Sequence, residues 1–396
     1  MAVYKLSEIC TKIGSGATPR GGKESYSEKG ISLIRSQNVL DYKFSYDGLA
    51  HITEEQAEKL NNVEVRSNDV LLNITGDSVA RACKVVSSVL PARVNQHVAI
   101  VRANEDVALS SYILYYLQLS KKNLLLLASG GATRNALTKE MIENLQISIP
   151  SIERQEKIVA IIDNLQDKIE LNNRISENLE QQAASYYYHL FVENADPSWR
   201  EGTISDLGTV VGGSTPSKAK PEYYTDDGIA WITPKDLSVD KSKFITHGAD
   251  DITELGLRNS SATIMPAGTV LFSSRAPIGY IAIADGEVTT NQGFKSVVPY
   301  ENIGTAFMFY FLKNALPTIE NMASGSTFKE ISGSTMRTVP AIIPDDDTLH
   351  KFSSFCEPLF QQQRALEAEN RTLATLRDSL LPRLMSGELD VSDIAI

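Results

Sequence analysis

The chain has 396 residues, 42% of them hydrophobic, and a formal net charge of −11 at pH 7. This length suggests two to four domains, and the hydrophobic content excludes a disordered protein. The sequence shows no apolar run long enough to span a bilayer, no signal-peptide pattern at its start and no CxxC pair among its three cysteines. We therefore expect a soluble protein in a reducing, cytoplasmic setting.

The acidic charge is unevenly distributed along the chain. Residues 1–150 carry a net charge of +2, whereas 151–200, 201–344 and 345–396 carry −4, −4 and −5. An acidic chain can still present a locally basic surface, so net charge alone does not exclude a nucleic-acid partner.

A glycine-rich loop, IGSGATPRGG, occupies residues 13–22. A phosphate-binding loop ending at Gly22-Lys23 would need glycine in place of Ala17 and a hydroxyl in place of Glu24, and a dinucleotide loop would need glycine in place of Pro19. Both nucleotide patterns fail, which leaves either a tight surface turn or a shaped loop with another role.

The first 150 residues indicate a mixed α/β module. Short β-branched runs such as Val70-Leu71-Leu72 are broken by Gly, Pro, Asn and Asp, as expected for several short strands. The apolar stretch 112–119 predicts a helix whose aromatic residues pack in a core.

A long helix is predicted after Pro150. No Gly or Pro occurs for more than forty residues, and apolar residues recur at spacings of three and four, with one polar gap that contains Asn172 and Ser176. The seam positions are Ile158, Ile162, Leu165, Ile169, Leu179, Ala183, Tyr186 and Leu190. This seam predicts a coiled-coil helix.

The chain then repeats its first module at an offset of 194 to 200 residues. LSEICTKIGSGATPR (6–20) matches ISDLGTVVGGSTPSK (204–218), NDVLLNITGDS (68–78) matches GTVLFSSRAPI (268–278), VNQHVAIV (94–101) matches TNQGFKSVV (290–298), and LASGGATRNAL (127–137) matches MASGSTFKEI (322–331). The order of the matches indicates a duplication. In the second module, the apolar stretch 306–314 is the counterpart of 112–119 and also predicts a helix.

A second long helix is predicted after Pro344. Asp345-Asp346-Asp347 supplies N-terminal caps, and we expect the helix to end near Pro382 and SGEL (386–389). Its seam is Phe352, Leu359, Leu366, Leu373 and Leu380, with Asn370 as a polar seam residue. Each long helix has a seam too narrow for a globular core, so we expect the two to pair.

The predicted fold class is α+β. Two similar mixed α/β modules are separated by a long antiparallel two-helix coiled coil, with pseudo-twofold symmetry. The expected segments are a first module (1–150), a central helical region (151–198), a second module (199–344) and a distal helical region (345–396).

The sequence favours binding over catalysis. It contains no HExxH, no GxSxG, no amino-methyltransferase motif and no helicase phosphate loop. Two similar modules on a stiff spacer can bind two separated sites on one partner molecule. DNA is such a partner, because its half-sites recur about 34 Å apart. Two alternatives stay open: a coiled-coil adaptor whose modules bind proteins, which salt would weaken less than DNA binding, and a self-contained enzyme.

The candidate DNA-contact residues lie in equivalent loops of the two modules. Their side chains can pair with base edges or phosphates, although each alone could be an ordinary loop or cap residue. In the first module they are Gly16, Thr18, Arg20, Arg35, Gln37, Asn38, Asn73, Thr75, Asn95, Gln96 and Arg134, and in the second Thr215, Lys218, Thr233, Lys235, Ser273, Ser274, Arg275, Asn291, Gln292 and Lys329. In this interpretation, the glycine loops let backbone approach DNA closely.

These motifs resemble the specificity (S) subunits of Type I restriction–modification enzymes. The resemblance rests on the paired glycine loops, NITG, the paired NQ, SGGATRNAL before IPSIERQEKIVAIID, and LRDSLLPRLMSGELDV near the end. It implies two target-recognition domains, at 1–150 and 199–344, and central and distal conserved helical regions. The second module departs from the pattern, with IPDDDTLHK for IPSIERQEK and SSRA for NITG.

The resemblance also implies partners. The chain would have no catalytic activity and would read a bipartite, asymmetric double-stranded DNA site. It would direct two modification (M) subunits to methylate adenine, and two restriction (R) subunits would translocate and cleave DNA. S-adenosylmethionine, ATP and Mg²⁺ would belong to those partners, and no metal is expected in this chain.

Three consecutive tyrosines, 186–188, cannot all face one helix seam, because neighbours on a helix are about 100° apart. We therefore expect Tyr187 and Tyr188 to contact the M subunits; the alternative is that they pack on the modules.

Overall fold

The computed structural model describes residues 2–19, 21, 25–130, 135–325 and 329–392. The chain divides into two compact units: residues 1–169 with 372–396, and residues 170–371. Each unit therefore contains one module and one half of each long helix.

The first unit is built on two four-stranded sheets and one two-stranded sheet. The sheet orders are β2-β9-β6-β7, β4-β3-β8-β5 and β1-β10. The strands are β1 (Ala2–Lys5), β2 (Cys10–Ser15), β3 (Ile31–Ile34), β4 (Ala50–Ile52), β5 (Glu64–Val65), β6 (Val70–Asn73), β7 (Ala82–Lys84), β8 (Ala92–Val94), β9 (Val98–Ala103) and β10 (Gln146–Ile149). The helices are α1 (Leu6–Ile9), α2 (Glu54–Glu58), α3 (Ser110–Leu119), α4 (Lys121–Ser129) and α5 (Lys139–Glu143).

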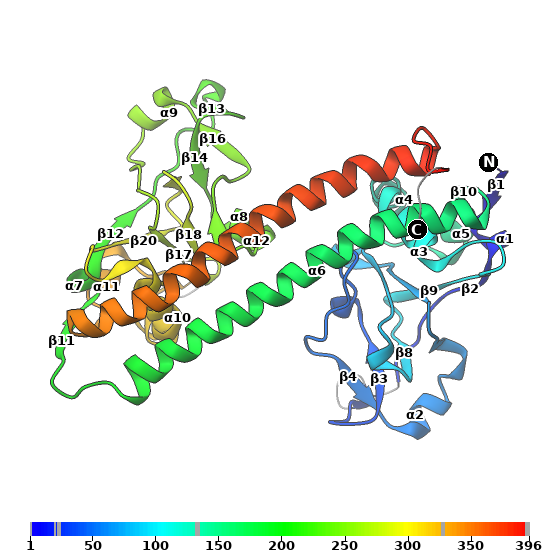
Figure 1. Cartoon of the computed structure of the whole chain (residues 1–396), viewed down its shortest axis with the longest axis horizontal. Helices are drawn as coiled ribbons and strands as arrows, with labels where there is room; N and C mark the ends of the chain where they lie inside the picture. Colours follow the sequence, from blue (N-terminus) through cyan, green and yellow to red (C-terminus); the bar gives the residue numbers. More distant parts are fainter. Residues whose placement is uncertain (1, 20, 22–24, 131–134, 326–328, 393–396) are drawn as a thin grey trace. The chain divides into compact units, whose positions relative to one another are not determined.

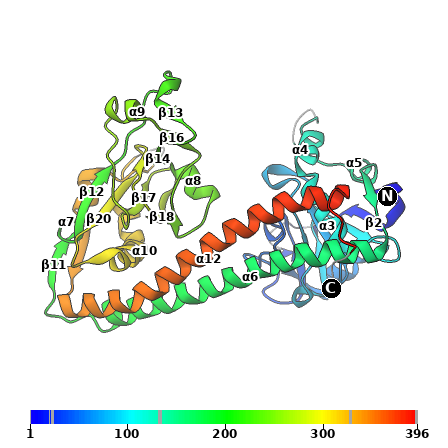
Figure 2. The same ribbon diagram turned by 45° about the horizontal axis from the view of Figure 1, so that its top comes forward.

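The second unit repeats this plan. Its sheets are β12-β20-β17-β18-β15, β13-β16-β14-β19 and β11-β21. The strands are β11 (Arg200–Thr203), β12 (Gly208–Gly212), β13 (Tyr224–Thr225), β14 (Ile229–Ile232), β15 (Phe244–Ile245), β16 (Asp250–Ile252), β17 (Val270–Ser274), β18 (Ile278–Ala284), β19 (Thr289–Thr290), β20 (Lys295–Pro299) and β21 (Pro340–Ile343). The helices are α7 (Ile204–Leu207), α8 (Pro234–Val239), α9 (Glu254–Arg258), α10 (Gly304–Met322) and α11 (Gly333–Arg337). In Figure 2, α10 lies next to β17 and β18.

The central strand of each module is buried on both faces. Val70 and Leu72 of β6 pack in one core while Leu71, between them, packs in a second core. In β17, Val270 packs in one core of the second module and the adjacent Leu271 packs in the other. Because successive side chains of a strand point to opposite faces, an uninterrupted apolar run suits a sheet between two cores.

The two long helices are α6 (Ile152–Tyr188, 37 residues) and α12 (Asp346–Ser386, 41 residues). They pack side by side and antiparallel in both units (Figure 1). In the first unit Arg377 donates to Gln166 Oε1 (2.8 Å), and in the second the Gln363 amide donates to the Ser176 carbonyl (3.0 Å). The predicted helix pair is confirmed.

The polar seam residues bond across the pair, as their position predicts. The Asn172 amide donates to Asn370 Oδ1 (2.9 Å), and the Asn370 amide donates to Asn173 Oδ1 (2.9 Å). Asn172 is fully buried. These bonds are lost if the helices slip, so they stabilise one register.

α12 ends at Ser386, within the predicted region near Pro382 and SGEL. Pro382 lies inside it, although proline removes a backbone hydrogen bond from a helix. Leu381, Leu384 and Met385 flank this proline and are buried in the core of the first module. Their burial, about 1.5–3 kcal/mol for each large side chain, offsets the missing bond.

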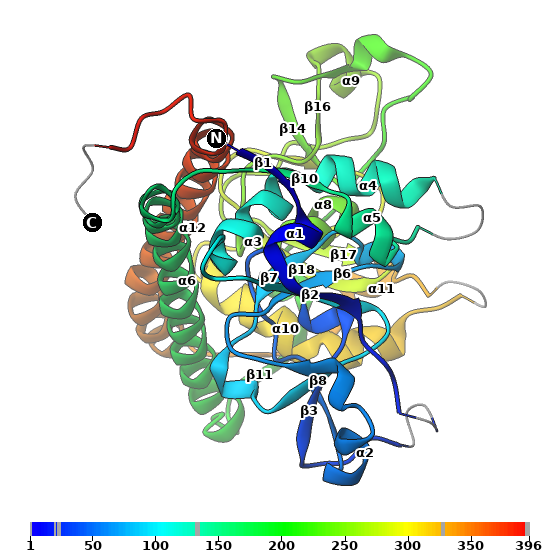
Figure 3. The same cartoon turned by 90° about the vertical axis from the view of Figure 1, so that its right-hand side faces the viewer.

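Both long helices also close the cores of the modules. Ile158 of α6 packs in the first module, where Figure 3 shows α3 beside α6, and the buried Gln155 side chain accepts from the Leu109 N–H (2.9 Å). In the second module Phe352 of α12 packs against Phe191 (ring centroids 5.2 Å apart). The aromatic residues of α3 and α10 are also buried in these cores, as predicted.

A buried ion pair joins α6, α10 and α12 to β15. Lys243, which precedes β15 and has 8% side-chain exposure, pairs with Glu180 of α6 and donates to Gln363 Oε1 (2.8 Å). Lys313 of α10 also bonds to Glu180 (2.6 Å). Burial alone would raise the pKa of the Glu180 carboxyl, but Lys243 and Lys313 outweigh it and lower this pKa to about 2.

We predict that Glu180→Gln destabilises the second unit by roughly 3 kcal/mol near pH 6, because a buried ammonium loses its partner. The folded pKa of Glu180 lies below the ordinary value of 4.5. The stabilisation is therefore present above about pH 4.5 and is lost as the pH falls toward 2. Denaturant unfolding of both proteins across this range should show their difference shrinking. Glu320→Gln, at an exposed position of α10, is the control, and a difference independent of pH would contradict the prediction.

Candidate nucleic-acid interface

The glycine-rich loop of each module packs onto the turn that holds the Asn-Gln pair. The Ala17 N–H donates to the Val94 carbonyl (3.0 Å), and the Ser214 N–H donates to the Thr290 carbonyl (2.8 Å). A Cβ at Gly16 would stand 2.0 Å from the Val94 oxygen, and one at Gly213 would stand 2.1 Å from the Asn291 oxygen. The close approach that requires glycine at these two positions is to the chain's own backbone.

The two residues of each Asn-Gln pair, Asn95-Gln96 and Asn291-Gln292, have different roles. The backbone N–H groups of Asn95 and Asn291 donate to the last residues of β3 and β14 (3.0 Å each). The Asn95 side chain then accepts from the His97 N–H (3.1 Å), as Asn291 does from the Gly293 N–H (2.8 Å). Gln96 and Gln292 point out and are exposed. Asparagine forms the turn, and glutamine is presented by it.

Several predicted contact residues are buried. The Asn38 amide donates to the Ser45 carbonyl (3.0 Å), and the Asn73 amide donates to the Ser36 carbonyl (2.8 Å). Ser273 and Ser274 donate to carbonyls of their own module (2.8 and 3.1 Å). With Asn95, these side chains have at most 6% exposure. Because their polar groups bond within the module and hold its loops in place, we do not include these residues among the proposed DNA contacts.

Other predicted residues are half-buried and partly engaged. The Arg35 guanidinium donates to the Gly48 carbonyl and lies 5.4 Å from the centre of the Tyr26 ring. Thr233 caps α8 together with Asp236 (2.6 Å), and Thr215 donates to the side chain of Gln292. Gly16 and Thr18 are also half-buried. Arg20 and Arg134 lie outside the described residues.

A hollow of about 450 Å³ lies on the first module. It is lined by Ser36, Gln37, Thr75, Gly76, Asp77, Ser78, Arg81 and His97. Thr75 Oγ1 bonds to His97 Nδ1 (2.7 Å), and the Gln96 amide nitrogen lies 3.1 Å from His97 Nε2. Gln37 and Thr75 were predicted, whereas Arg81 was missed, as was His97, which directly follows the predicted Gln96.

The second module exposes several of its predicted polar and basic residues. Lys218, Lys235, Gln292 and Lys329 are exposed. Arg275 pairs with Glu330 (3.4 Å), and Lys295, which sequence reasoning missed, reaches the same carboxylate (3.7 Å). Burial lowers the pKa of Lys295, an effect that Glu330 opposes. Two cations share one carboxylate, so this surface suits a polyanion.

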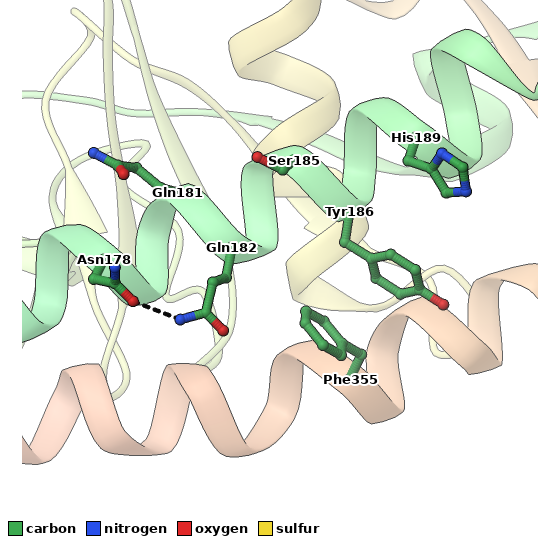
Figure 4. Close-up of a pocket in the computed structure, with 7 residues that line it drawn as sticks. All are labelled: Asn178, Gln181, Gln182, Ser185, Tyr186, His189 and Phe355. Carbon is green, nitrogen blue, oxygen red and sulfur yellow. Dashed lines mark hydrogen bonds between the residues drawn. The ribbon is translucent and has the colours of Figure 1, made fainter.

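The two tyrosines predicted to contact a partner have different environments. Tyr187 has 6% exposure and packs against Phe307 (5.8 Å between ring centroids), so its ring belongs to the core of the module. Tyr188 is 51% exposed. An open groove of about 470 Å³ lies nearby on the helix pair, lined by Asn178, Gln181, Gln182, Ser185, Tyr186, His189 and Phe355 (Figure 4).

The described residues contain no cluster of three or more His, Cys, Asp or Glu side chains placed to hold a metal ion. Within the same residues, no helix is long and apolar enough to cross a membrane. Burial raises the pKa of each cysteine thiol, Cys10, Cys83 and Cys356, to about 12, so the neutral thiol dominates at pH 7.

Comparison with known proteins identifies relatives that are all specificity proteins of Type I restriction enzymes. A model of the Type I restriction modification DNA specificity domain matches residues 1–181 and 197–374. The Type I restriction enzyme HindI specificity subunit of Haemophilus influenzae is 24% identical over 441 aligned positions, which cover 91% of this chain and 94% of that protein. The MjaIX specificity subunit of Methanocaldococcus jannaschii is 40% identical over 158 residues, which cover 39% of this chain and 36% of that protein.

A solved structure shares the fold. The S subunit of a Type I restriction–modification system from M. genitalium aligns with a TM-score of 0.57 at 15% identity, covering 97% of this chain and 95% of that one.

We predict that Gly16→Ala and Gly213→Ala each destabilise their module by about 2 kcal/mol or more, because the added methyl group meets backbone oxygens. Gly14→Ala and Gly212→Ala are matched controls, since no described atom lies within 4 Å of a Cβ at either position. Denaturant unfolding of the four variants measures this. Equal stability of the Gly16 and Gly14 variants would show that the loop relaxes without cost.

Proposed function

Because the chain belongs to the family of Type I restriction–modification DNA specificity subunits, we propose that it reads a bipartite, asymmetric site in double-stranded DNA. Each module contacts one half-site through its exposed loops, and the paired helices set the gap between the half-sites.

The observation that carries this proposal is one loop scaffold with two sets of exposed side chains. Gly16 and Gly213, like Asn95 and Asn291, make equivalent backbone contacts in the two modules. The side chains at the surface differ: exposed Gln37 and Gln96 with half-buried Thr75 in the first module, and exposed Lys218, Lys235, Gln292 and Lys329 with half-buried Arg275 in the second. A constant scaffold with variable surface residues suits the reading of two different sequences.

The proposed assembly contains two M subunits and two R subunits. In it this chain has no catalytic activity and works in the cytoplasm. The M subunits methylate adenine with S-adenosylmethionine, and the R subunits cleave DNA with ATP and Mg²⁺. The contribution of this chain is to place those partners at one sequence.

The helical region is the proposed docking surface for the M subunits. Its acidic charge disfavours DNA phosphates, and it exposes large apolar side chains, among them Tyr188 and Phe355, which is 39% exposed. The open groove beside Phe355 adds amide groups that can pair with a partner's backbone.

We predict that replacing residues 199–344 with the corresponding segment of another specificity subunit changes one half-site only. The physical reason is that each module has its own complete set of exposed loops. The measurement is mapping of methylated adenines after reconstitution with the M subunit, and exchange of residues 1–150 is the reciprocal control. A continuous site, a variable gap, or a change in both half-sites after one exchange would contradict the proposal.

We predict that Tyr188→Ser weakens M-subunit binding about tenfold, because an exposed aromatic side chain contributes about 1–2 kcal/mol at an interface. Gel filtration and titration with purified M subunit measure this. Tyr300→Ser, which removes another exposed tyrosine that is not part of either long helix (44% exposed), is the control. Undiminished affinity of a folded Tyr188→Ser chain would remove this residue from the interface.

A further inference from the structure

The loop after the central strand has the same backbone frame in both modules. The Ile74 N–H donates to the His97 carbonyl (3.0 Å), and the Ser274 N–H donates to the Gly293 carbonyl (2.7 Å). On the other side, Leu137 N–H donates to the Ile74 carbonyl (2.8 Å), as Ile331 N–H does to the Ser274 carbonyl (3.1 Å).

Isolated bridges then pair the next residues, Thr75 with Ala136 and Arg275 with Glu330. Positions 75 and 275 therefore occupy the same place in the two modules.

The side chains at this place differ in reach and in chemistry. Thr75 is short, and its hydroxyl is bonded to His97 (2.7 Å). Arg275 is long, and the side chain that faces it across the bridge is Glu330, which replaces Ala136 of the first module. The described ion pair uses Nη1 of Arg275 (3.4 Å). The guanidinium thus keeps Nη2 and Nε for a second, two-pronged partner.

Glu330 acts on Arg275 from one side only. The carboxylate also contacts Lys295 (3.7 Å), whose ammonium donates to the Gln292 carbonyl (3.3 Å) behind the exposed Gln292 side chain. The carboxylate is therefore anchored, and it restricts the arginine without neutralising the surface around it. An arginine oriented in this way loses less freedom on binding than a free one.

We propose that Arg275 is a specificity-determining residue of the second module, which reads a guanine in its half-site, and that Glu330 is its positioning residue. The planar fork matches the O6 and N7 acceptors of guanine in the major groove, a pairing that a threonine hydroxyl cannot make. This inference rests on the proposed function and deepens it: it assigns a base class to one position of one half-site.

The test is methylation mapping on a randomised DNA library with the reconstituted complex of this chain and its M subunit. Wild type should require guanine at a fixed position of the half-site that exchange of residues 199–344 alters. Arg275→Gln should reduce that preference about ten- to a hundredfold and shift it toward adenine, which glutamine pairs with in two-pronged fashion. Glu330→Gln should reduce the preference at the same position by a smaller factor.

Two further variants separate base reading from charge and from folding. Arg275→Lys retains the charge and loses the planar fork, so the guanine preference should fall while the salt dependence of binding stays as in wild type. Arg258→Gln removes an arginine that pairs with Glu254 of its own helix (3.7 Å) and should leave every base preference unchanged.

The outcomes are distinguishable. A bipartite site whose base preferences are unchanged in both Arg275→Gln and Arg275→Lys overturns the inference and leaves the proposed function standing. A change confined to the half-site of the first module also overturns it. A wild-type complex that methylates no bipartite site overturns the proposed function itself.

Discussion

The structure depends on one constraint: in each module, one of the two hydrophobic cores is closed by residues of both long helices. The core of the first module includes Ile158 and Ile162 from α6 together with Leu381 and Leu384 from α12. The core of the second includes Ala183 and Tyr187 from α6, and Leu349, Phe352, Cys356 and Phe360 from α12. Each helix therefore buries one face against its partner helix and another against a module, which is why seams too narrow for a globular core are sufficient.

Charged groups reinforce this arrangement where apolar contact is incomplete. Glu367 of α12 accepts from the backbone N–H groups of Lys243 and Phe244 (2.8 and 3.1 Å), so β15 is fixed to a helix by its main chain. In the first unit Arg377 of α12 lies 4.2 Å from the centre of the Tyr42 ring. Because the helices are fixed to the modules in this way, the recognition loops are supported by rigid elements, as a site that must hold its geometry requires.

The sequence predicted the parts of this fold that periodicity controls. The heptad seams, the Asn172 and Asn370 seam residues, and the N-terminal cap at Asp345, which accepts from the Thr348 N–H (2.8 Å), all follow from local pattern. The continuation of α12 through Pro382 does not follow from local pattern, because burial of distant residues offsets a local helix breaker. The ion pair between Lys243 and Glu180 could not be predicted either, because the two residues are far apart in sequence and no spacing pattern connects them.

The candidate site could be predicted only in part for a related reason. Asparagine pairs well with adenine, but it also forms turns by bonding to nearby backbone, and sequence alone does not distinguish these uses. The structure gives Asn38 and Asn95 the second use, whereas the buried Asn73 amide bonds to the carbonyl of Ser36, a residue distant in sequence. His97 and Lys295 were missed because their significance lies in contacts with Thr75 and Glu330, which fold formation creates.

The shared cores also have a consequence for folding during synthesis. The α6 surface of the first module is complete early, but Leu381, Leu384, Met385 and Val391, all buried in that core, are synthesised more than two hundred residues after the module's last strand, β10. Until then the apolar surface that they cover faces solvent. Such contacts raise the contact order and delay the closing step until the chain is nearly whole. The core of the first module beside the long helices is thus completed only after the second module has been synthesised.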